Sequence, residues 1–386
     1  MEQALPKKAL ITHIINGLHT GGAEMMLYKL LSAMDRKRFD ARVITLIDGG
    51  DIRAKIEDLG IEVHSLGISR SSPNLAGAAR LVRYLHQHPP DLIQTWMYHA
   101  DLLGGVVGKL FTSAPIVWNV QTADSAYHPD NKRTLWIIKL CAWLSSMVPQ
   151  YVISCSQVAC KIHTEIGYAK SRLLPIPNGA DLASFQPDET ARTAFRAELN
   201  LPDTTMLVGM VARFHPQKDH QNFVRAAARL HQIMPEVHFV LCGDEVTGAN
   251  DTLSQWIQEG GLVNHCHLLG RRKDTPRINA ALDVATLSSA YGEGFPNVLV
   301  EALACGVPCV ATDSGDSALI VEGVGISVPV CAPDALASGW EALLKMSAEE
   351  KAKLRQAARQ RVVEKYALPS VVAQYEGVYK KLLGIE

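Results

Sequence analysis

Short apolar runs alternate with segments of helical periodicity along most of the chain. A parallel sheet covered by helices buries both faces of its strands, so its strands are apolar throughout, whereas the connecting helices carry apolar residues every three or four positions. In the first half of the chain, helices are expected that include 23–33 and 73–87. Strands are expected over 8–15, 41–47, 61–66, 91–96, 115–120 and 150–155.

A break in this pattern falls at Leu174–Gly179, where two prolines and an Asn-Gly pair interrupt the periodicity. The alternation restarts with a helix over 219–234 and strands over 206–211, 237–242 and 267–269. The expected fold is therefore α/β, with two Rossmann-like doubly wound domains over 1–185 and 186–366. Such sheets bind ligands at the carboxyl ends of their strands, so two facing domains would form an interdomain cleft.

The stretch 283–312 is the most informative part of the chain, because it has the order strand, loop, helix, glycine, strand. Unpaired backbone N–H groups at the start of its helix favour an anion. Glu293 lies in the loop and Glu301 on the helix, and carboxylates bind sugar hydroxyls. The arrangement suits a ligand made of a sugar, a diphosphate and a ribose. The alternative is an ordinary glycine-rich turn of an α/β protein, with glutamates that only compensate the helix dipole.

Composition narrows the function further. The chain has 386 residues, of which 47% are hydrophobic and 20% charged, and a net charge of −1 that gives no electrostatic argument for nucleic acid. The apolar run near the N-terminus is too short for a signal peptide, and no apolar stretch reaches the length of a membrane span, so a cytoplasmic protein is expected. The eight cysteines include no Cys-x-x-Cys pair, which predicts buried, reduced thiols.

The segment from Glu293 through Gly294-Phe295-Pro296-Asn297 to Glu301, followed by Ala302–Pro308, resembles the E-x7-E signature of retaining glycosyltransferases of family 4. These are two-domain enzymes with the GT-B fold, and the resemblance covers nearly all of the chain. In GT-B enzymes the C-terminal tail crosses back to the first domain. The resemblance therefore implies that a helix within 367–386 packs on the N-terminal domain, which would lie on the acceptor side, with the C-terminal domain on the donor side.

The resemblance also implies roles for individual residues. Arg213 and Lys218, in Gly209–Asp219, match the family's pair of cations on the donor diphosphate, and Glu293 would contact the donor sugar; these three are the predicted catalytic residues. Two cations at a strand end suit the charge of a leaving nucleoside diphosphate. The predicted donor-binding residues are Gly21, Gly22, Gly243, Arg271, Gly294, Phe295, Pro296, Asn297, Val298, Leu299 and, on the ribose, Glu301.

One departure from the family concerns the transfer site. Many members carry a His just after the strand that matches 114–120, where this chain has Asn119 and Gln121. Either could supply a neutral hydrogen bond, but neither can carry a proton. His99 follows the preceding strand and is a further candidate, although a lone His near a strand end is more often structural.

The helix expected over 134–147 carries Trp136 and Trp143 on one face, seven residues apart. Packing of this helix against the first sheet is favoured, because the segment has little polar face. Contact with a membrane surface is the alternative, since Lys132 and Arg133 lie nearby.

These observations predict a retaining glycosyltransferase that moves a hexose or N-acetylhexosamine from a nucleoside diphosphate sugar, a UDP-sugar before a GDP-sugar. The acceptor would be a sugar, a lipid-linked glycan or a small aglycone in polysaccharide or glycoconjugate biosynthesis. No metal and no cofactor beyond the nucleotide-sugar co-substrate are expected, because no Asp-x-Asp lies at a strand end. Two alternatives stay open: a non-catalytic sugar-nucleotide-binding subunit and a GT-B-type sugar-nucleotide epimerase.

Overall fold

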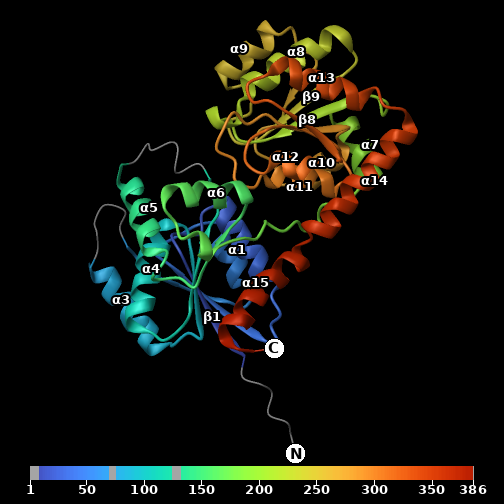
Figure 1. Ribbon diagram of the computed structural model, residues 1–386. Coiled ribbons are helices and arrows are strands. Elements are labelled where there is room, and N and C mark those ends of the chain that lie inside the picture. The colour runs from blue at the N-terminus through green and yellow to red at the C-terminus, as the bar shows by residue number, and fades with distance from the viewer. Residues whose placement is uncertain (1–7, 69–74, 124–131, 386) are drawn as a thin grey trace, which may run out of the picture. The chain divides into compact units, whose positions relative to one another are not determined.

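The computed structural model describes residues 8–68, 75–123 and 132–385. The chain forms two compact units (Figure 1). Unit 1 comprises Met1–Gly179 with Leu368–Glu386, and unit 2 comprises Ala180–Ala367. Among the described residues, no helix is both long and apolar enough to cross a membrane.

Unit 1 is built on a parallel sheet of seven strands in the order β3-β2-β1-β4-β5-β6-β7. The strands are β1 (Ala9–Ile15), β2 (Phe39–Thr45), β3 (Glu62–Ser65), β4 (Leu92–Trp96), β5 (Ile116–Val120), β6 (Tyr151–Ser154) and β7 (Leu173–Pro175). The helices are α1 (Gly22–Ala33), α2 (Ile52–Glu57), α3 (Leu75–Gln87), α4 (Tyr98–Phe111), α5 (Lys132–Leu144), α6 (Gln157–Ile166), the 3-10 turn η2 (Lys170–Arg172) and α15 (Leu368–Leu383). The break in the pattern that was predicted to begin at Leu174 is wrong at its start, because Leu173–Pro175 forms the short strand β7. This strand pairs with β6 at the sheet edge, where a proline is tolerated.

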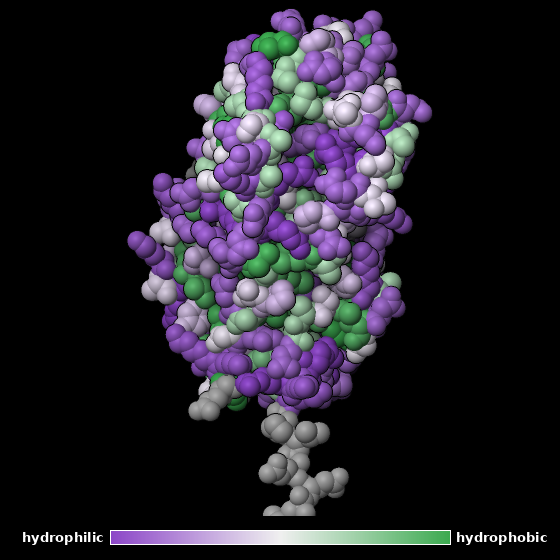
Figure 2. All heavy atoms as spheres, turned by 90° about the vertical axis from the view of Figure 1, so that its right-hand side faces the viewer, coloured by the Kyte–Doolittle hydropathy of each residue, from purple (hydrophilic) through white to green (hydrophobic). Residues whose placement is uncertain are grey.

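Two apolar cores lie on the two faces of this sheet. One is formed with α1, α2 and α15, and the other with α3, α4 and α5. The C-terminal helix α15 contributes fully buried Tyr375 and Tyr379, whose hydroxyls are hydrogen-bonded to Asn119 of β5 and Gln94 of β4. The last segment of the chain is therefore part of the core of unit 1. The outer surface of unit 1, on the side that Figure 2 shows, is mostly hydrophilic, with apolar residues in separate groups.

Helix α5 packs on unit 1 through its smaller residues, including Ile138, Cys141 and Ala142. Its two tryptophans, Trp136 and Trp143, are 76% and 66% exposed. The packing of both tryptophans on the sheet, which the sequence pattern favoured, is therefore wrong.

Unit 2 is built on a parallel sheet of six strands in the order β10-β9-β8-β11-β12-β13. The strands are β8 (Leu207–Val211), β9 (His238–Cys242), β10 (Cys266–Leu268), β11 (Val284–Leu287), β12 (Cys309–Thr312) and β13 (Gly325–Val328). The helices are α7 (Glu189–Glu198), the 3-10 turn η3 (Pro216–Lys218), α8 (His220–Ile233), α9 (Asp251–Glu259), α10 (Thr275–Ala281), α11 (Asn297–Ala304), α12 (Ser317–Val321), α13 (Pro333–Leu344) and α14 (Ala348–Lys365). Both sheets are doubly wound, as the alternating pattern predicts.

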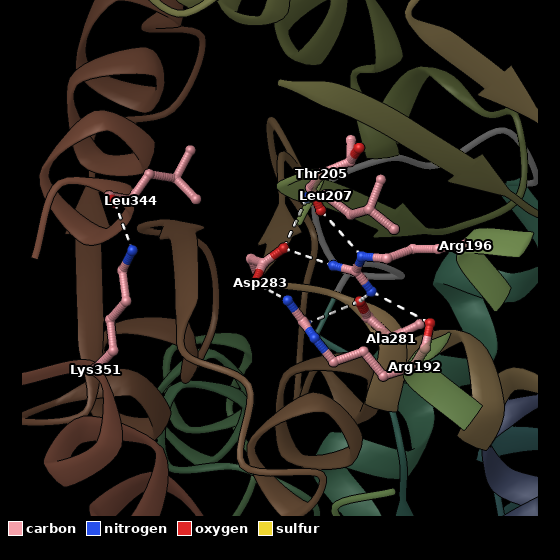
Figure 3. Close-up of polar contacts among 8 residues, drawn as sticks. All are labelled: Arg192, Arg196, Thr205, Leu207, Ala281, Asp283, Leu344 and Lys351. Atoms are coloured by element: carbon pink, nitrogen blue, oxygen red, sulfur yellow. Dashed lines mark hydrogen bonds and ion pairs between the residues drawn. The ribbon is translucent and has the colours of Figure 1, made fainter. Parts of the chain in front are cut away.

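A buried guanidinium ties α7 to the amino ends of the central strands of unit 2 (Figure 3). Arg196 is fully buried, and it donates to Asp283 at 2.9 Å and to the carbonyl of Ala281 at 2.8 Å. The carboxylate of Asp283 also accepts from Arg192 at 2.7 Å and from the backbone N–H of Leu207 at 2.8 Å. Because a buried charge is tolerated only when it is paired and hydrogen-bonded, this network fixes α7 against β8 and β11.

The chain passes between the units at two places. Ala180 donates its N–H to the carbonyl of Tyr366 at 2.8 Å and forms a bridge with Ala367, so it belongs to unit 2. The boundary predicted from the sequence lies later, at 185, because no sequence pattern indicates a pairing between residues so far apart in the chain.

Candidate active site

Unit 2 has one position where the winding of the sheet reverses, between β8 and β11. The chain runs from β8 outward through β9 and β10, and then returns to place β11 on the other side of β8. The loops after β8 and β11 therefore diverge at the carboxyl ends of these neighbouring strands, which is where open α/β sheets bind ligands. Arg213 and Lys218 follow β8, and Glu293 follows β11. The topology thus brings the predicted catalytic residues to the reversal point.

Lys218 and Glu293 form an ion pair, with side chains 19% and 8% exposed. The ammonium and the hydroxyl of Ser289, at 2.5 Å, both bond to Oε1 of Glu293. Among the described residues no partner is found for Oε2. A carboxylate held this way keeps one oxygen available to accept a hydrogen bond from a ligand hydroxyl, and the ammonium beside it adds a positive charge at the same place.

Backbone and hydroxyl contacts hold the two loops together. Ala290 donates its N–H to the carbonyl of Gln217 at 2.9 Å, and the Ser288 hydroxyl donates to the carbonyl of Asp219 at 3.1 Å. Asp219 has a left-handed backbone, with φ of 46°, and its carboxylate caps α8 by accepting from the N–H of Asn222 at 3.0 Å. A strained, capped residue next to Lys218 fixes where that side chain starts.

A third loop, after β12, contacts the backbone of Glu293 and Gly294. The N–H of Asp316 donates to the carbonyl of Gly294 at 3.1 Å. Gly315 has φ of 63°, and a Cβ there would lie 2.3 Å from the carbonyl oxygen of Glu293. Only glycine permits this approach, so the position of Glu293 depends on a residue that the motif does not include.

Helix α11 begins directly after the loop that follows β11, with Pro296 as its N-cap residue and no side-chain cap. Among the described residues no partner is found for the N–H groups of Asn297 and Val298, whereas Leu299 donates its N–H to the carbonyl of Pro296 at 3.1 Å. Of the three residues at the helix start that were predicted to bind the donor, Asn297 and Val298 thus have backbone N–H groups available for an anion. The N–H of Leu299 is already hydrogen-bonded to Pro296. Glu301 is half-buried, one turn into the helix.

The other donor-side candidates differ in exposure. Arg213 is exposed, and no partner is found for its guanidinium in the described part of the chain. Gly243 packs on the loop after β8, where a Cβ would lie 2.1 Å from the carbonyl oxygen of Ala212. Arg271 is exposed and lies 3.6 Å from Asp244. Gly243 therefore sets the shape of the neighbouring loop, and the two arginines are the groups that a ligand could contact.

The equivalent reversal point in unit 1 lies between β1 and β4. Gly21 is the N-cap residue of α1 and Gly22 is the first residue of this helix. A Cβ on Gly21 would lie 2.4 Å from the Glu24 carboxylate, whereas Gly22 has open space around it. Burial raises the pKa of Glu24. A diphosphate at this helix start would therefore meet a carboxylate, which the glycine pattern alone did not reveal.

The transfer-site candidates also lie in unit 1. His99 is exposed on the first turn of α4, after β4. Asn119 is fully buried: its amide donates to the Tyr375 hydroxyl at 3.0 Å, and its oxygen accepts from Gln121 at 2.8 Å. Its side-chain bonds are therefore taken by the fold, and Gln121, which is half-buried, is the member of this pair nearer to solvent.

Sequence reasoning missed the groups that position Glu293. Ser289 ends the strand-like run as the second of two serines, and Gly315 follows the next strand as Ser-Gly-Asp. A polar pair at the end of a buried strand is the signal that could have indicated Ser289. In the described part of the chain, no group of three or more His, Cys, Asp or Glu side chains is placed to hold a metal ion.

Comparison with known proteins agrees with this geometry. The family model described as Glycosyl transferases group 1 matches residues 191–361, and the Glycosyltransferase Family 4 model matches residues 20–184. The two models together match most of the chain, one on each Rossmann-like unit. The chain belongs to glycosyltransferase family 4.

The segments of this family 4 glycosyltransferase that match its relatives extend across both units. It is 24% identical over 315 residues to EpsF of Bacillus subtilis (strain 168), covering 79% of each chain. It is 26% identical over 251 residues to the UDP-Gal:alpha-D-GlcNAc-diphosphoundecaprenol alpha-1,3-galactosyltransferase of Escherichia coli, covering 62% of each. The structure of HepE from Anabaena in complex with UDP matches with a TM-score of 0.84 at 24% identity, over 96% of this chain and 99% of HepE. The fold is therefore GT-B, as the resemblance implied.

Proposed function

We propose that this glycosyltransferase transfers a hexose or N-acetylhexosamine from a UDP-sugar, with retention of the anomeric configuration and without a metal ion. The acceptor we propose is a sugar of a lipid-linked glycan. The observation that carries the proposal is the Lys218–Glu293 pair at the reversal point of unit 2, because it joins a cation for a diphosphate to a carboxylate for a sugar.

The donor and the acceptor are supported by similar proteins. HepE was solved in complex with UDP and with UDP-glucose. The relative from Escherichia coli has a name that specifies UDP-Gal as donor and a diphosphoundecaprenol-linked GlcNAc as acceptor. A GDP-sugar is the second choice of donor.

In the proposed mechanism, Arg213 and Lys218 bind the diphosphate together with the N–H groups of Asn297 and Val298. Glu293 Oε2 accepts from a hydroxyl of the donor hexose, and Glu301 accepts from the ribose hydroxyls. The bond between the anomeric carbon and the phosphate oxygen breaks, and the acceptor oxygen bonds to the same face of that carbon. The acceptor proton passes to the leaving phosphate oxygen, so no protein base is needed. The cations stabilise the charge that develops on the diphosphate.

The test separates the two glutamates. Glu301→Ala should weaken the affinity for bare UDP, whereas Glu293→Gln should lower turnover and leave that affinity unchanged. Thermal shifts with UDP, GDP and their sugars measure binding, since a ligand that binds the folded state raises its stability. Equal effects of both substitutions on bare UDP would contradict the assignment.

The alternatives predict other products. A non-catalytic subunit would bind UDP-sugar and release no UDP with any acceptor, and an epimerase would convert the UDP-sugar without an acceptor. Two results together would support retaining transfer. UDP release should depend on an acceptor, and NMR should show that the new linkage has the same axial or equatorial configuration as the donor. Activity that disappears with a chelator and returns with a divalent cation would overturn the metal-free part of the proposal.

A further inference from the structure

A pocket of about 250 Å³ opens on unit 2, beside helix α14. One wall of the pocket is a single face of this helix, made of Arg355, Gln356, Arg359, Gln360 and Val363. The other lining residues are Pro187, Glu189 and Gly306. Helices α11 and α14 pack on each other (Figure 1), and Gly306 places the pocket just beyond the carboxyl end of α11. Pockets for drug-sized ligands are larger, so this one suits a small molecule.

Backbone carbonyls hold Arg359 in place. Its Nη1 donates to the carbonyl of Phe185 at 3.2 Å and to that of Ala304, at the end of α11. Among the described residues, no partner is found for Nε and Nη2 of this half-buried guanidinium. Because the side chain is already fixed, it loses little conformational freedom when a ligand binds to it.

Arg355 lies one helical turn before Arg359 on the same face of α14 and is half-buried. The described part of the chain offers no partner for its guanidinium. Burial and the Glu301 carboxylate raise the pKa of the Cys305 thiol to about 12, and the charges of Arg359 and Arg355 act in the opposite direction. Both guanidiniums therefore lie near this thiol, so they can contact one ligand.

The charges of the pocket favour an anion with hydroxyl groups. The two guanidiniums share the lining with Glu189, and in the described structure no ion pair joins this carboxylate to either of them. Two guanidiniums on one helix face can bind a phosphate through several N–H···O bonds. The carboxylate would repel a second anionic group and accept a hydrogen bond from a hydroxyl. Gln356 and Gln360 add exposed amides, which also bind hydroxyls.

We infer that this pocket binds a hexose monophosphate. The phosphate lies against Arg355 and Arg359, and the sugar hydroxyls bond to Glu189 and to the two glutamine amides. A nucleoside diphosphate sugar fits less well, because it brings a second phosphate toward the carboxylate and is too large for a pocket of this volume.

The donor site and this pocket lie at opposite ends of α11. Asn297 begins the helix at the proposed donor site, and Gly306 follows its carboxyl end. A helix of 8 residues is about 12 Å long. The two ligands therefore do not overlap, and binding of a hexose monophosphate needs neither a nucleotide nor a transfer reaction.

Calorimetric titration of the full-length protein with glucose 6-phosphate, inorganic phosphate and glucose tests the pocket. Glucose 6-phosphate is the probe because its anomeric carbon carries no phosphate, so it does not copy the donor. We expect it to bind about tenfold more tightly than inorganic phosphate, since its hydroxyls add hydrogen bonds. Glucose alone should give no measurable heat, and saturating UDP should leave the affinity for glucose 6-phosphate unchanged.

Substitutions locate the site. Arg355→Gln should weaken the binding of glucose 6-phosphate about tenfold or more, because it removes a charged donor. It should keep the melting temperature, since no contact of this guanidinium within the described structure is lost. The matched control is Arg225→Gln, which removes an exposed arginine of α8 outside the pocket and should leave binding unchanged. Glu189→Ala should lower the ratio of the affinities for glucose 6-phosphate and inorganic phosphate, because it removes an acceptor for a hydroxyl.

Absence of glucose 6-phosphate binding would overturn the inference, and so would equal losses in Arg355→Gln and Arg225→Gln. Competition by UDP would place the ligand in the donor site instead. Inorganic phosphate that binds as tightly as glucose 6-phosphate would contradict a hexose monophosphate, because the pocket would then recognise the anion without the sugar.

Discussion

The two units have the same topology at their reversal points and different chemistry there. In unit 2 the loops after β8 and β11 are joined by a backbone hydrogen bond, and they hold the Lys218–Glu293 pair, in which Glu293 is buried and Lys218 half-buried. In unit 1 the loop after β1 carries glycines, and the first turns of α1 and α4 carry Glu24 and the exposed His99. One fold thus supplies a place for a ligand twice, and the side chains decide which ligand can be bound.

The difference follows from what each proposed ligand demands. A nucleoside diphosphate sugar always presents the same charges, so its site needs fixed cations, fixed amides and a held carboxylate. An acceptor sugar presents neutral hydroxyls in an arrangement that varies between acceptors. Unit 2 therefore carries a family motif, and unit 1 carries few residues whose roles a motif can assign.

The largest expected effect concerns the framework that supports the site in unit 2. Asp283→Ala would leave the fully buried Arg196 without its carboxylate partner. Loss of one partner of a buried pair costs about 3–5 kcal/mol, and burial already lowers the pKa of Arg196. Denaturant unfolding should show unit 2 destabilised by this amount and unit 1 unchanged. As a control, Glu349→Ala removes an exposed pair with Lys353 and should cost less than about 1 kcal/mol. A loss below about 1 kcal/mol for Asp283→Ala would show that the network does not hold α7.

The next effect concerns catalysis. Lys218→Ala should lower the transfer rate on the order of 10²-fold or more, because the cation acts most strongly on the charge of the leaving group. Lys218→Ala should also weaken the affinity for bare UDP, whereas Glu293→Gln should leave that affinity unchanged. If Lys218 served only to hold Glu293, the double variant would be no worse than Glu293→Gln and UDP affinity would be unchanged. A loss under about threefold would make Lys218 a surface cation.

Much of this fold could be predicted from the sequence, because parallel strands are apolar and bounded by turns. The strands β7 and β13 were missed, since Leu173–Pro175 contains a proline and Gly325–Val328 is only partly buried. Lys218 and Glu293 could be proposed because both lie in motifs. Ser289 and Gly315 could not, because their role depends on contacts between loops that are separate in the sequence. The side of α5 that faces solvent could not be predicted either, since both of its sides are apolar.

A smaller effect tests whether Asn119 stabilises the fold of unit 1 or takes part in sugar transfer. Tyr375→Phe removes the acceptor of the Asn119 amide, and both residues are fully buried. An unsatisfied buried donor costs about 1–3 kcal/mol, which should appear as a loss of stability in unit 1 with little change in the rate of the folded enzyme. Tyr28→Phe on α1 is the matched control, because that half-buried ring lies beside Lys55 and no hydrogen bond to its hydroxyl is found among the described residues. A large rate loss with unchanged stability would place Asn119 at the transfer site instead.

The smallest effect is a pH dependence that should separate the units. His238 of unit 2 lies against His267 at 3.0 Å and against the ring of His265, and burial together with these neighbours lowers its pKa to about 4. The unfolded chain, with an ordinary histidine pKa near 6.5, then binds more protons than the folded one between about pH 6.5 and 4. Stability from this group is therefore complete above about pH 6.5 and falls as the pH is lowered toward 4. His238→Asn should flatten the fall in the unfolding free energy of unit 2 between pH 7 and 5, whereas His86→Asn, at an exposed position on α3, should leave it unchanged. An unchanged slope in His238→Asn would mean that the cluster protonates as easily in the folded protein as in the unfolded chain.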